Sequence, residues 1–427
     1  MCCLPAEWDV SSPEETPATE RAGGPEQAAH ETVEVIADRE GYLRAVEEIR
    51  AGHGPIAIDA ERASGYRYSQ RAYLIQVFRR GSGTFLFDPP AIGHFGELNE
   101  AIVDTEWILH AASQDLTCLR EVGLDPIHLF DTELAARLAG MPRVGLGTVV
   151  EELLGIHLAK EHSAADWSTR PLPQAWLVYA ALDVELLVDV REKLGEILDR
   201  DNKSDIAAQE FEAVLARDLV VVRAEPWRRL GGLHTVRGQR NLAVARELWL
   251  ARDAYAREID TAPGRLVPDS ALSAAARILP ATKRDLAGIK EFTGRASRTQ
   301  IDRWWNAIQA GLATTDLPAL RVQGESIPPP RVWSEKNPEA DRRLKKARSA
   351  VTDAATELNL PVENLLTPEL LRRVAWTPPE PITTESIADA LRESGARPWQ
   401  IDATSQVIAE AFVEAGQTPE QASETDS

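Results

Sequence analysis

Short apolar runs alternate with amphipathic stretches over the first half of the chain. The strand-like runs are rich in β-branched and aromatic residues and are bounded by turn residues; they cover residues 33–36, 56–58, 73–78, 84–88 and 107–110. Apolar residues at helical spacing lie between or after them, over residues 41–50, 114–122, 132–138, 147–154 and 173–199. Gly81 and Gly83 predict a hairpin between the third and fourth runs. The alternation predicts a mixed-sheet α/β domain.

The remainder of the chain is predicted to be helical and to form two pieces, 241–311 and 341–413. Three consecutive prolines, 328–330, predict a stiff linker between them. The segment 266–272 resembles 360–366, so the two pieces read as a diverged internal repeat. The predicted segments are a disordered acidic tail 1–31, an α/β domain 32–205, a connector 206–236, a helical domain 237–312, a Pro-containing linker 313–337, a second helical domain 338–415 and a disordered tail 416–427.

Charge is unevenly distributed along the chain. The net charge of −20 argues against a nucleic-acid partner, yet residues 237–311 hold 13 Lys and Arg against 8 acids. A basic domain on an acidic chain still offers a local binding face for nucleic acid. No apolar run reaches the ~20 residues of a membrane span, and no signal peptide is visible. The three cysteines are scattered, which fits a cytoplasmic protein without disulfides.

Two acids follow the apolar run 56–58. Side chains on a strand alternate between its faces, so Asp59 and Glu61 are expected to point the same way. Adjacent anions repel each other unless a hard cation lies between them, and carboxylate oxygens are the ligands that Mg²⁺ and Mn²⁺ prefer. A strand that runs out into solvent also carries acids, so the pair alone leaves both interpretations open.

Two further acids are predicted to lie on helices. Ser113 is a suitable N-cap, which puts Asp115 in the first helical turn behind the carboxyl end of a strand. The helix dipole favours an acid there in any case. Tyr179 and Asp183 stand at i and i+4, so they share a helix face and can hold one water molecule between them. A core tyrosine with a satisfied hydroxyl is the alternative.

Four acids on three elements meet the requirement of a two-metal site for phosphoryl transfer, where shared carboxylates hold two cations ~3.5–4 Å apart. The sequence has no Gly-rich phosphate loop, which argues against a kinase, an NTPase or a nucleotide cofactor. It has no His-rich zinc spacing and no nucleophile elbow either. Of the reaction classes considered, hydrolysis of a phosphodiester by metal-activated water remains.

The order of these residues resembles a known family. Asp59-Ala60-Glu61, Asp115, and Tyr179 with Asp183 match the DEDDy 3′→5′ exonucleases, and the match is closest to the bacterial ribonuclease D family. The resemblance covers about 33–198 and includes further segments: Tyr73-Leu74-Ile75-Gln76, His110-Ala111-Ala112-Ser113-Gln114-Asp115-Leu116, Asp131-Thr132, Asp166-Trp167 and Arg170-Pro171-Leu172. Ala112 and Gln114 replace commoner Gly and acidic residues, which leaves the proposed ligands unaffected. The piece 241–311 resembles the HRDC domain (helicase and ribonuclease D C-terminal), and the second helical piece looks like a weaker copy.

The resemblance implies a ribonuclease H-like exonuclease fold followed by two all-α HRDC-like domains. It also implies a role for each site residue. Asp59, Glu61, Asp115 and Asp183 would ligate two Mg²⁺ or Mn²⁺ ions, and Tyr179 would orient the attacking water. Candidate contacts to nucleic acid are Arg62, Arg67, Arg71 and Gln76, although solvated loop arginines are the simpler interpretation.

The activity implied is that of a metal-dependent 3′→5′ exoribonuclease, a monomer that matures tRNA precursors and other structured RNAs. Two alternatives remain open. A DNA exonuclease uses the same acids, and no residue here visibly reads the 2′-hydroxyl. An inert RNA-binding protein could keep the fold, although four intact acids argue against it. The basic balance of residues 237–311 predicts that the helical domains serve RNA binding rather than chemistry.

Overall fold

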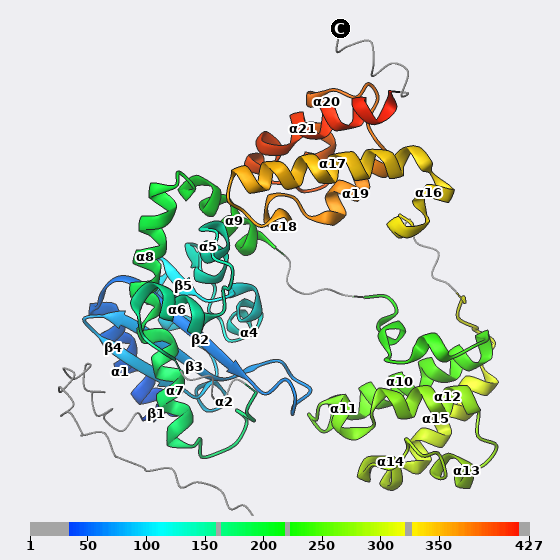
Figure 1. Ribbon diagram of the computed structural model, residues 1–427. Helices are drawn as coiled ribbons and strands as arrows, with labels where there is room; N and C mark the ends of the chain where they lie inside the picture. The colour runs from blue at the N-terminus through cyan, green and yellow to red at the C-terminus, as the bar shows by residue number, and fades with distance from the viewer. Residues whose placement is uncertain (1–33, 159–163, 218–222, 321–326, 418–427) are drawn as a thin grey trace, which may run out of the picture.

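The protein is described here by a computed structural model that covers residues 34–158, 164–217, 223–320 and 327–417. Within these ranges the first part is an α/β domain with a six-stranded sheet in the order β1-β4-β3-β2-β5-β6 (Figure 1). The strands are β1 (Val35–Ile36), β2 (His53–Arg62), β3 (Ala72–Arg80), β4 (Gly83–Phe87), β5 (Trp107–Leu109) and β6 (Leu129–Asp131). The predicted mixed sheet is confirmed.

The central strand β2 pairs with β3 in the antiparallel sense and with β5 in the parallel sense. β3 and β4 form the predicted hairpin, with Gly81 and Gly83 at positive φ in its turn. The sequence pattern did not indicate β6, because three residues are too few to show a period. Its parallel pairing with β5 extends the sheet beyond the last predicted strand.

Each face of the sheet has its own helical cover. Ile56, Ile58 and Ala60 of β2 point into the larger core, which also receives α1 and α3. Ala57 lies on the opposite face, where α7 and α8 contribute Val184, Leu187 and Val188. The helices of this domain are α1 (Arg39–Ala51), α2 (Pro89–Ile92), α3 (Gly96–Ile102), α4 (Leu116–Glu121), α5 (Thr132–Leu138), α6 (Leu146–Leu154), α7 (Gln174–Glu185), α8 (Leu187–Arg200) and α9 (Ser204–Ala216).

The single long helix predicted over residues 173–199 is wrong. The chain forms α7 and α8 instead, and Leu186 lies between them with φ −87° and ψ −14°. Apolar residues continue through the junction, so the hydrophobic pattern carries no sign of the break. The division allows α7 to cover β2, β3 and β4 while α8 covers β2 and β5.

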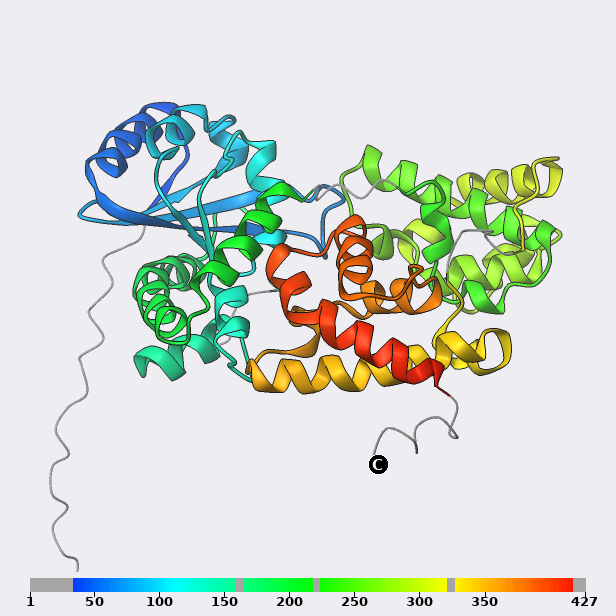
Figure 2. The ribbon, with the colours of Figure 1, turned by 90° about the horizontal axis from the view of Figure 1, so that it is seen from above.

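The rest of the described chain is helical, as predicted. The first helical part, which we call the HRDC domain after its resemblance, contains α10 (Gln239–Glu258), α11 (Pro263–Leu266), α12 (Asp269–Ile278), α13 (Lys283–Ala287), α14 (Arg295–Thr299) and α15 (Ile301–Ala313). The second, the C-terminal helical domain, contains α16 (Trp333–Lys336), α17 (Pro338–Glu357), α18 (Val362–Leu365), α19 (Pro368–Trp376), α20 (Thr384–Glu393) and α21 (Pro398–Gly416). Both lie on the side of the sheet from which the β2–β3 loop projects (Figures 1 and 2).

Two elements cross the predicted domain boundaries. α9 begins within the predicted α/β domain and continues beyond residue 205, packing against β6 and α5. Trp333 of α16 is fully buried against Trp376 with ring centroids 4.9 Å apart, although residues 313–337 were predicted to be a linker. The predicted tail 1–31 lies outside the described residues, as does 418–427. Among the described helices, none is long and apolar enough to cross a membrane.

Candidate active site

Asp59 and Glu61 lie near the end of β2, on the sheet face that α7 covers. β2 pairs with β5 only at Ile56 and Ala57, whereas its pairing with β3 continues past the acids and sets Asp59 opposite Gln76. The carboxylate oxygens of Asp59, Glu61 and Asp183 lie within 4.8 Å of one another. The two strand acids therefore point the same way, as their spacing predicted, and α7 brings a third acid to them.

Asp115 reaches the same place from a tight turn after β5. The turn begins at Ala111, which has φ 60°, and continues as a short 3₁₀ helix, η1 (Ala112–Gln114). The N-cap of α4 is Asp115 and not Ser113, so the predicted start of this helix is wrong by two residues. The Asp115 side chain makes no capping bond. The Asp115 carboxylate therefore does not cap the helix, which was the structural role that the helix dipole suggested for it.

Tyr179 and Asp183 share one face of α7, as their spacing predicted. The Tyr179 hydroxyl hydrogen-bonds the Asp183 carboxylate. α7 has apolar residues on nearly all sides because it packs between the sheet and other elements, and Asp183 is buried. A helix fixed in this way holds the tyrosine and the acid at a constant position relative to β2.

Burial and mutual repulsion raise the pKa values of these acids. Burial, followed by the charges of Asp59, Asp183 and Asp115, raises the pKa of Glu61 to about 10. Burial and then Asp59 raise the pKa of Asp183 to about 8, against the opposing hydrogen bond from Tyr179. Burial is also the main cause that raises the pKa of Asp59 and of Asp115. Such a group of acids is electrostatically unfavourable without a cation.

These acids line one cavity of about 450 Å³. The β2–β3 loop forms part of its wall through Ser64, Gly65 and Tyr66, and His110 and Leu187 form other parts. Burial lowers the pKa of His110 to about 4, so its ring is neutral at pH 7. Hard oxygen donors at one wall of a cavity are the ligand set that suits Mg²⁺ or Mn²⁺.

Comparison with known proteins places this geometry in a family. The chain is 32% identical over 318 residues to a ribonuclease D from Jannaschia sp. (strain CCS1), covering 71% of this chain and 80% of that protein. It is 31% identical to a ribonuclease D from Pseudomonas paraeruginosa, covering 74% of this chain and 82% of that protein. The chain belongs to the ribonuclease D family. It is therefore a 3′→5′ exoribonuclease, a nuclease that acts on RNA, and its exonuclease family is metal dependent.

Family models and solved structures agree with the ribonuclease D architecture. A 3′-5′ exonuclease model matches residues 33–199, an HRDC domain model matches 241–308, and a 3′ to 5′ exonuclease C-terminal domain model matches 326–412. The structure resembles Escherichia coli RNase D with a TM-score of 0.64 at 27% identity, covering 84% of this chain and 98% of that one. It also resembles a protein from Bifidobacterium adolescentis with a TM-score of 0.82 at 37% identity, covering 90% and 97%.

The four predicted nucleic-acid contacts lie in different environments. Arg62 lines the cavity, and its Nη2 lies 3.7 Å from Asp115 Oδ1. Arg67 Nε donates to Ser168 Oγ at 2.7 Å, and Arg71 lies over the Tyr73 ring, both outside the cavity lining. Gln76 is fully buried, so its side chain has no surface with which to contact RNA in this structure. Its amide has no hydrogen-bond partner among the described residues.

Asp131 is a residue that the sequence interpretation did not assign to the site. Its carboxylate accepts hydrogen bonds from the N–H groups of Ala111 and Ala112 in the turn before Asp115, at 3.1 and 2.9 Å. It also caps α5 by accepting from the N–H groups of Glu133 and Leu134. Asp131 thereby ties the turn that carries Asp115 to the neighbouring strand. An acid directly before Thr132 and Glu133 is a helix N-cap signal that could have indicated it.

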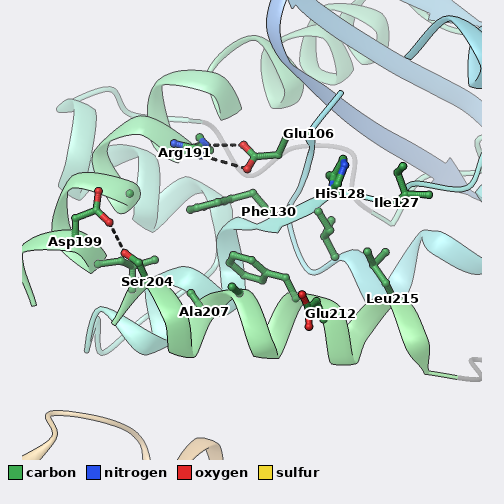
Figure 3. A pocket seen from close by; sticks show the side chains of 15 residues that line it. Glu106, Ile127, His128, Phe130, Arg191, Asp199, Ser204, Ala207, Glu212 and Leu215 are labelled. Atoms are coloured by element: carbon green, nitrogen blue, oxygen red, sulfur yellow. Dashed lines mark hydrogen bonds and ion pairs between the residues drawn. The ribbon is translucent and has the colours of Figure 1, made fainter. Parts of the chain in front are cut away.

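A second cavity, of about 340 Å³, lies between β6, α8 and α9 (Figure 3). Two of its charged groups bind each other, because the Arg191 guanidinium donates to Glu106 at 2.7 and 3.2 Å and lies over the Phe130 ring. Phe211 of α9 packs on Phe130 with ring centroids 5.0 Å apart. This cavity is a gap between packed elements, and the four site acids do not line it.

Proposed function

We propose that the cavity lined by Asp59, Glu61, Asp115 and Asp183 is the centre at which this exoribonuclease hydrolyses RNA 3′ ends. The observation that carries the proposal is the approach of three carboxylates to within 4.8 Å, with the fourth acid on the same cavity wall. Acids with raised pKa values at one wall become favourable once cations replace their protons. Two divalent ions, Mg²⁺ or Mn²⁺, fit this donor set.

The residues around the cavity divide the work. Asp59, Glu61, Asp115 and Asp183 would hold the ions, which supply Lewis acidity at the scissile phosphate and activate water when they are bound. Tyr179 donates its hydroxyl hydrogen bond toward the same group of acids, a position from which it can orient the attacking water. Arg62 beside Asp115 provides a positive charge for a phosphate at the cavity wall.

Structured RNAs, with tRNA precursors among them, are the substrate we propose. The related Escherichia coli RNase D is described as an exoribonuclease involved in structured RNA processing, and residues 237–311 of this chain carry the basic excess expected of an RNA-binding domain. We propose that the protein acts as a cytoplasmic monomer. Its predicted segments are the two tails, the α/β domain, the connector, the linker and the two helical domains. α9 and α16 pack across the predicted boundaries of that division.

Digestion of matched RNA and DNA oligomers tests the proposal. In Mg²⁺ buffer, Asp59→Asn removes a metal ligand and is expected to abolish nearly all cleavage of RNA from its 3′ end. Tyr179→Phe removes one hydrogen bond and no charge, so its single-turnover rate should fall ~10²–10⁴-fold with metal binding intact. Asp104→Asn changes an exposed acid outside the cavity and serves as the control.

Three outcomes would contradict the proposal. Substantial turnover by Asp59→Asn would move the chemistry elsewhere. A wild-type rate for Tyr179→Phe would make that residue a packing tyrosine. Equal cleavage of RNA and DNA oligomers would remove the preference for RNA substrates.

A further inference from the structure

The loop between β2 and β3, residues 63–71, forms part of the catalytic cavity. Ser64, Gly65 and Tyr66 line the cavity, and the Tyr66 hydroxyl donates to the backbone oxygen of Ala164, another lining residue, at 3.4 Å. The loop directly follows the strand that carries Asp59 and Glu61. Any group that holds this loop therefore also shapes the space that a nucleotide enters.

The HRDC domain holds the loop through several hydrogen bonds. Asp260 accepts from the Ser69 N–H at 2.8 Å and from the Tyr73 hydroxyl at 3.3 Å. The Ala262 N–H donates to the Tyr66 backbone oxygen at 2.9 Å. Asp260 has φ 44°, a conformation that aspartate tolerates better than most residues and that persists where surrounding contacts fix it. Figure 1 shows α11 beside this loop.

Arg265 of α11 is fixed at the edge of the cavity. Its Nε donates to the Gly65 backbone oxygen at 2.6 Å, and its guanidinium carbon lies 3.8 Å from the centroid of the Tyr66 ring. The residue is exposed, and no carboxylate pairs with it anywhere in the described part of the chain. The same ranges provide no hydrogen-bond partner for its two Nη groups. A guanidinium held in this way is a preorganised site for a phosphate.

We propose that Arg265 of the HRDC domain binds a phosphate of the RNA strand upstream of the scissile bond. The HRDC domain then serves RNA binding, as its charge predicted, and does so at the edge of the cavity itself. This inference rests on the proposed catalytic centre at Asp59. Its chemical basis is a permanent positive charge, stacked on a cavity-lining tyrosine and directed by a backbone oxygen.

The length of the substrate separates this contact from the chemistry. A dinucleotide contains only the scissile phosphate, whereas a longer RNA oligomer also contains upstream phosphates. Arg265→Gln is therefore expected to raise KM for a longer oligomer about tenfold, as for loss of one charged hydrogen bond. The slope of log affinity for the longer oligomer against log salt concentration should become shallower by about 0.7, the value for one phosphate contact on a single strand. Both kinetic constants on the dinucleotide should stay at wild-type values.

Arg257→Gln is the matched control at the same interface. Arg257 contacts Tyr68 of the loop, with 3.1 Å between its Nη2 and the tyrosine hydroxyl, but it is ion-paired with Asp253 and Tyr68 does not line the cavity. Loss of domain docking alone should affect both variants equally, whereas loss of a phosphate contact affects only Arg265→Gln. Thermal unfolding of each variant monitors docking and folding.

An unchanged KM of Arg265→Gln on the longer oligomer would overturn the inference, and so would the same loss for Arg257→Gln. An equal loss on dinucleotide and longer oligomer would also overturn it, because Arg265 would then act on the loop and not on an upstream phosphate. Failure of the proposed catalytic centre gives a different result, since Asp59→Asn would then retain activity on the dinucleotide.

Discussion

The two helical domains meet the catalytic domain in different ways. The HRDC domain has a separate hydrophobic core, to which the catalytic domain contributes only the partly buried Tyr68 among the described residues. The C-terminal helical domain instead continues the core of the sheet, and one cluster of buried side chains runs from Ile56 to Phe412. The first interface consists mainly of hydrogen bonds to a loop, and the second of apolar packing with buried charges.

The buried charges of the second interface are Glu210 of α9 and Lys203, the N-cap residue of that helix. Glu210 accepts hydrogen bonds from Arg397 Nη2 at 2.7 Å and from Trp399 Nε1 at 2.8 Å. Lys203 is buried and donates to the backbone oxygens of Leu138 and Asn359, at 2.7 and 3.1 Å. These contacts are far from the acids in sequence and do not line the catalytic cavity. One helical domain thus shares its core with the sheet, while the other is docked on the loop that lines the cavity with the acids.

The strongest way to test this comparison is to break the second interface. Glu210→Ala leaves Arg397 without its acid and Trp399 without its acceptor. Removal of one partner of a buried pair costs about 3–5 kcal/mol, and partial exposure of Arg397 reduces the expected loss to about 2–4 kcal/mol. Urea unfolding measures this change in the free energy of unfolding, and cleavage of a dinucleotide should proceed at the wild-type rate once the variant is folded.

Glu212→Ala provides the control for this change. Glu212 lies two positions away on the same helix and is exposed, so its loss should alter stability by no more than about 0.5 kcal/mol. A stability loss for Glu210→Ala no larger than that of the control would show that the buried pair does not hold the domains together.

The pH dependence of stability tests the acids of the cavity and does not depend on the second interface. The folded protein keeps Asp183 protonated up to about pH 8, whereas an ordinary aspartate has a pKa of 3.8. Between these values the folded state binds more protons than the unfolded state, so stability without metal should fall as pH rises from about 4 to 8. Asp183→Asn should flatten this dependence in EDTA. Thermal unfolding measures it, and an equally steep fall in the variant would contradict the assignment.

The smallest expected effect is at the loop itself. Asp260→Ala removes the acceptor for the Ser69 N–H and the Tyr73 hydroxyl, which together stabilise the docking by about 1–2 kcal/mol. Amide hydrogen exchange over residues 63–71 should accelerate, and kcat/KM on longer RNA should fall a few-fold. Asp302→Ala, which breaks an exposed ion pair with Lys283 in the same domain, should change neither. Unchanged exchange in Asp260→Ala would show that the loop keeps its conformation without the HRDC domain.

Local periodicity predicted much of the fold and the common direction of the side chains within each of two pairs of site residues. The spacing of Asp59 and Glu61 on a strand, and of Tyr179 and Asp183 on a helix, follows from backbone geometry alone. The carboxylates of Asp59, Glu61 and Asp183 do approach one another. Asp115 was a candidate because it follows the carboxyl end of a strand, and the resemblance then gave it the role of a ligand. The turn that carries it has no period.

Features set by contacts between distant segments were not predictable. The break at Leu186 has no Gly or Pro to mark it, because it follows from packing of α7 and α8 on different strands. Gln76 was a candidate RNA contact because of its motif, but its burial depends on the helix that covers β3. Contacts of Asp260 and Arg265 with the loop join residues nearly 200 positions apart, and sequence pattern carries no information about such pairs.

The left-handed turn at Ala111 restricts which residues this position can accept during divergence. With φ 60°, a side chain with a Cβ costs roughly 1 kcal/mol, glycine avoids that cost, and asparagine tolerates it. Valine or isoleucine would force the turn open and release the amide groups that bind Asp131. We therefore expect glycine, alanine or asparagine here in homologues that retain this spacing between His110 and Asp115. A β-branched residue at this position would indicate a homologue in which the turn has a different conformation. In such a homologue the counterpart of Asp115 must be found from a structure and not from a sequence alignment.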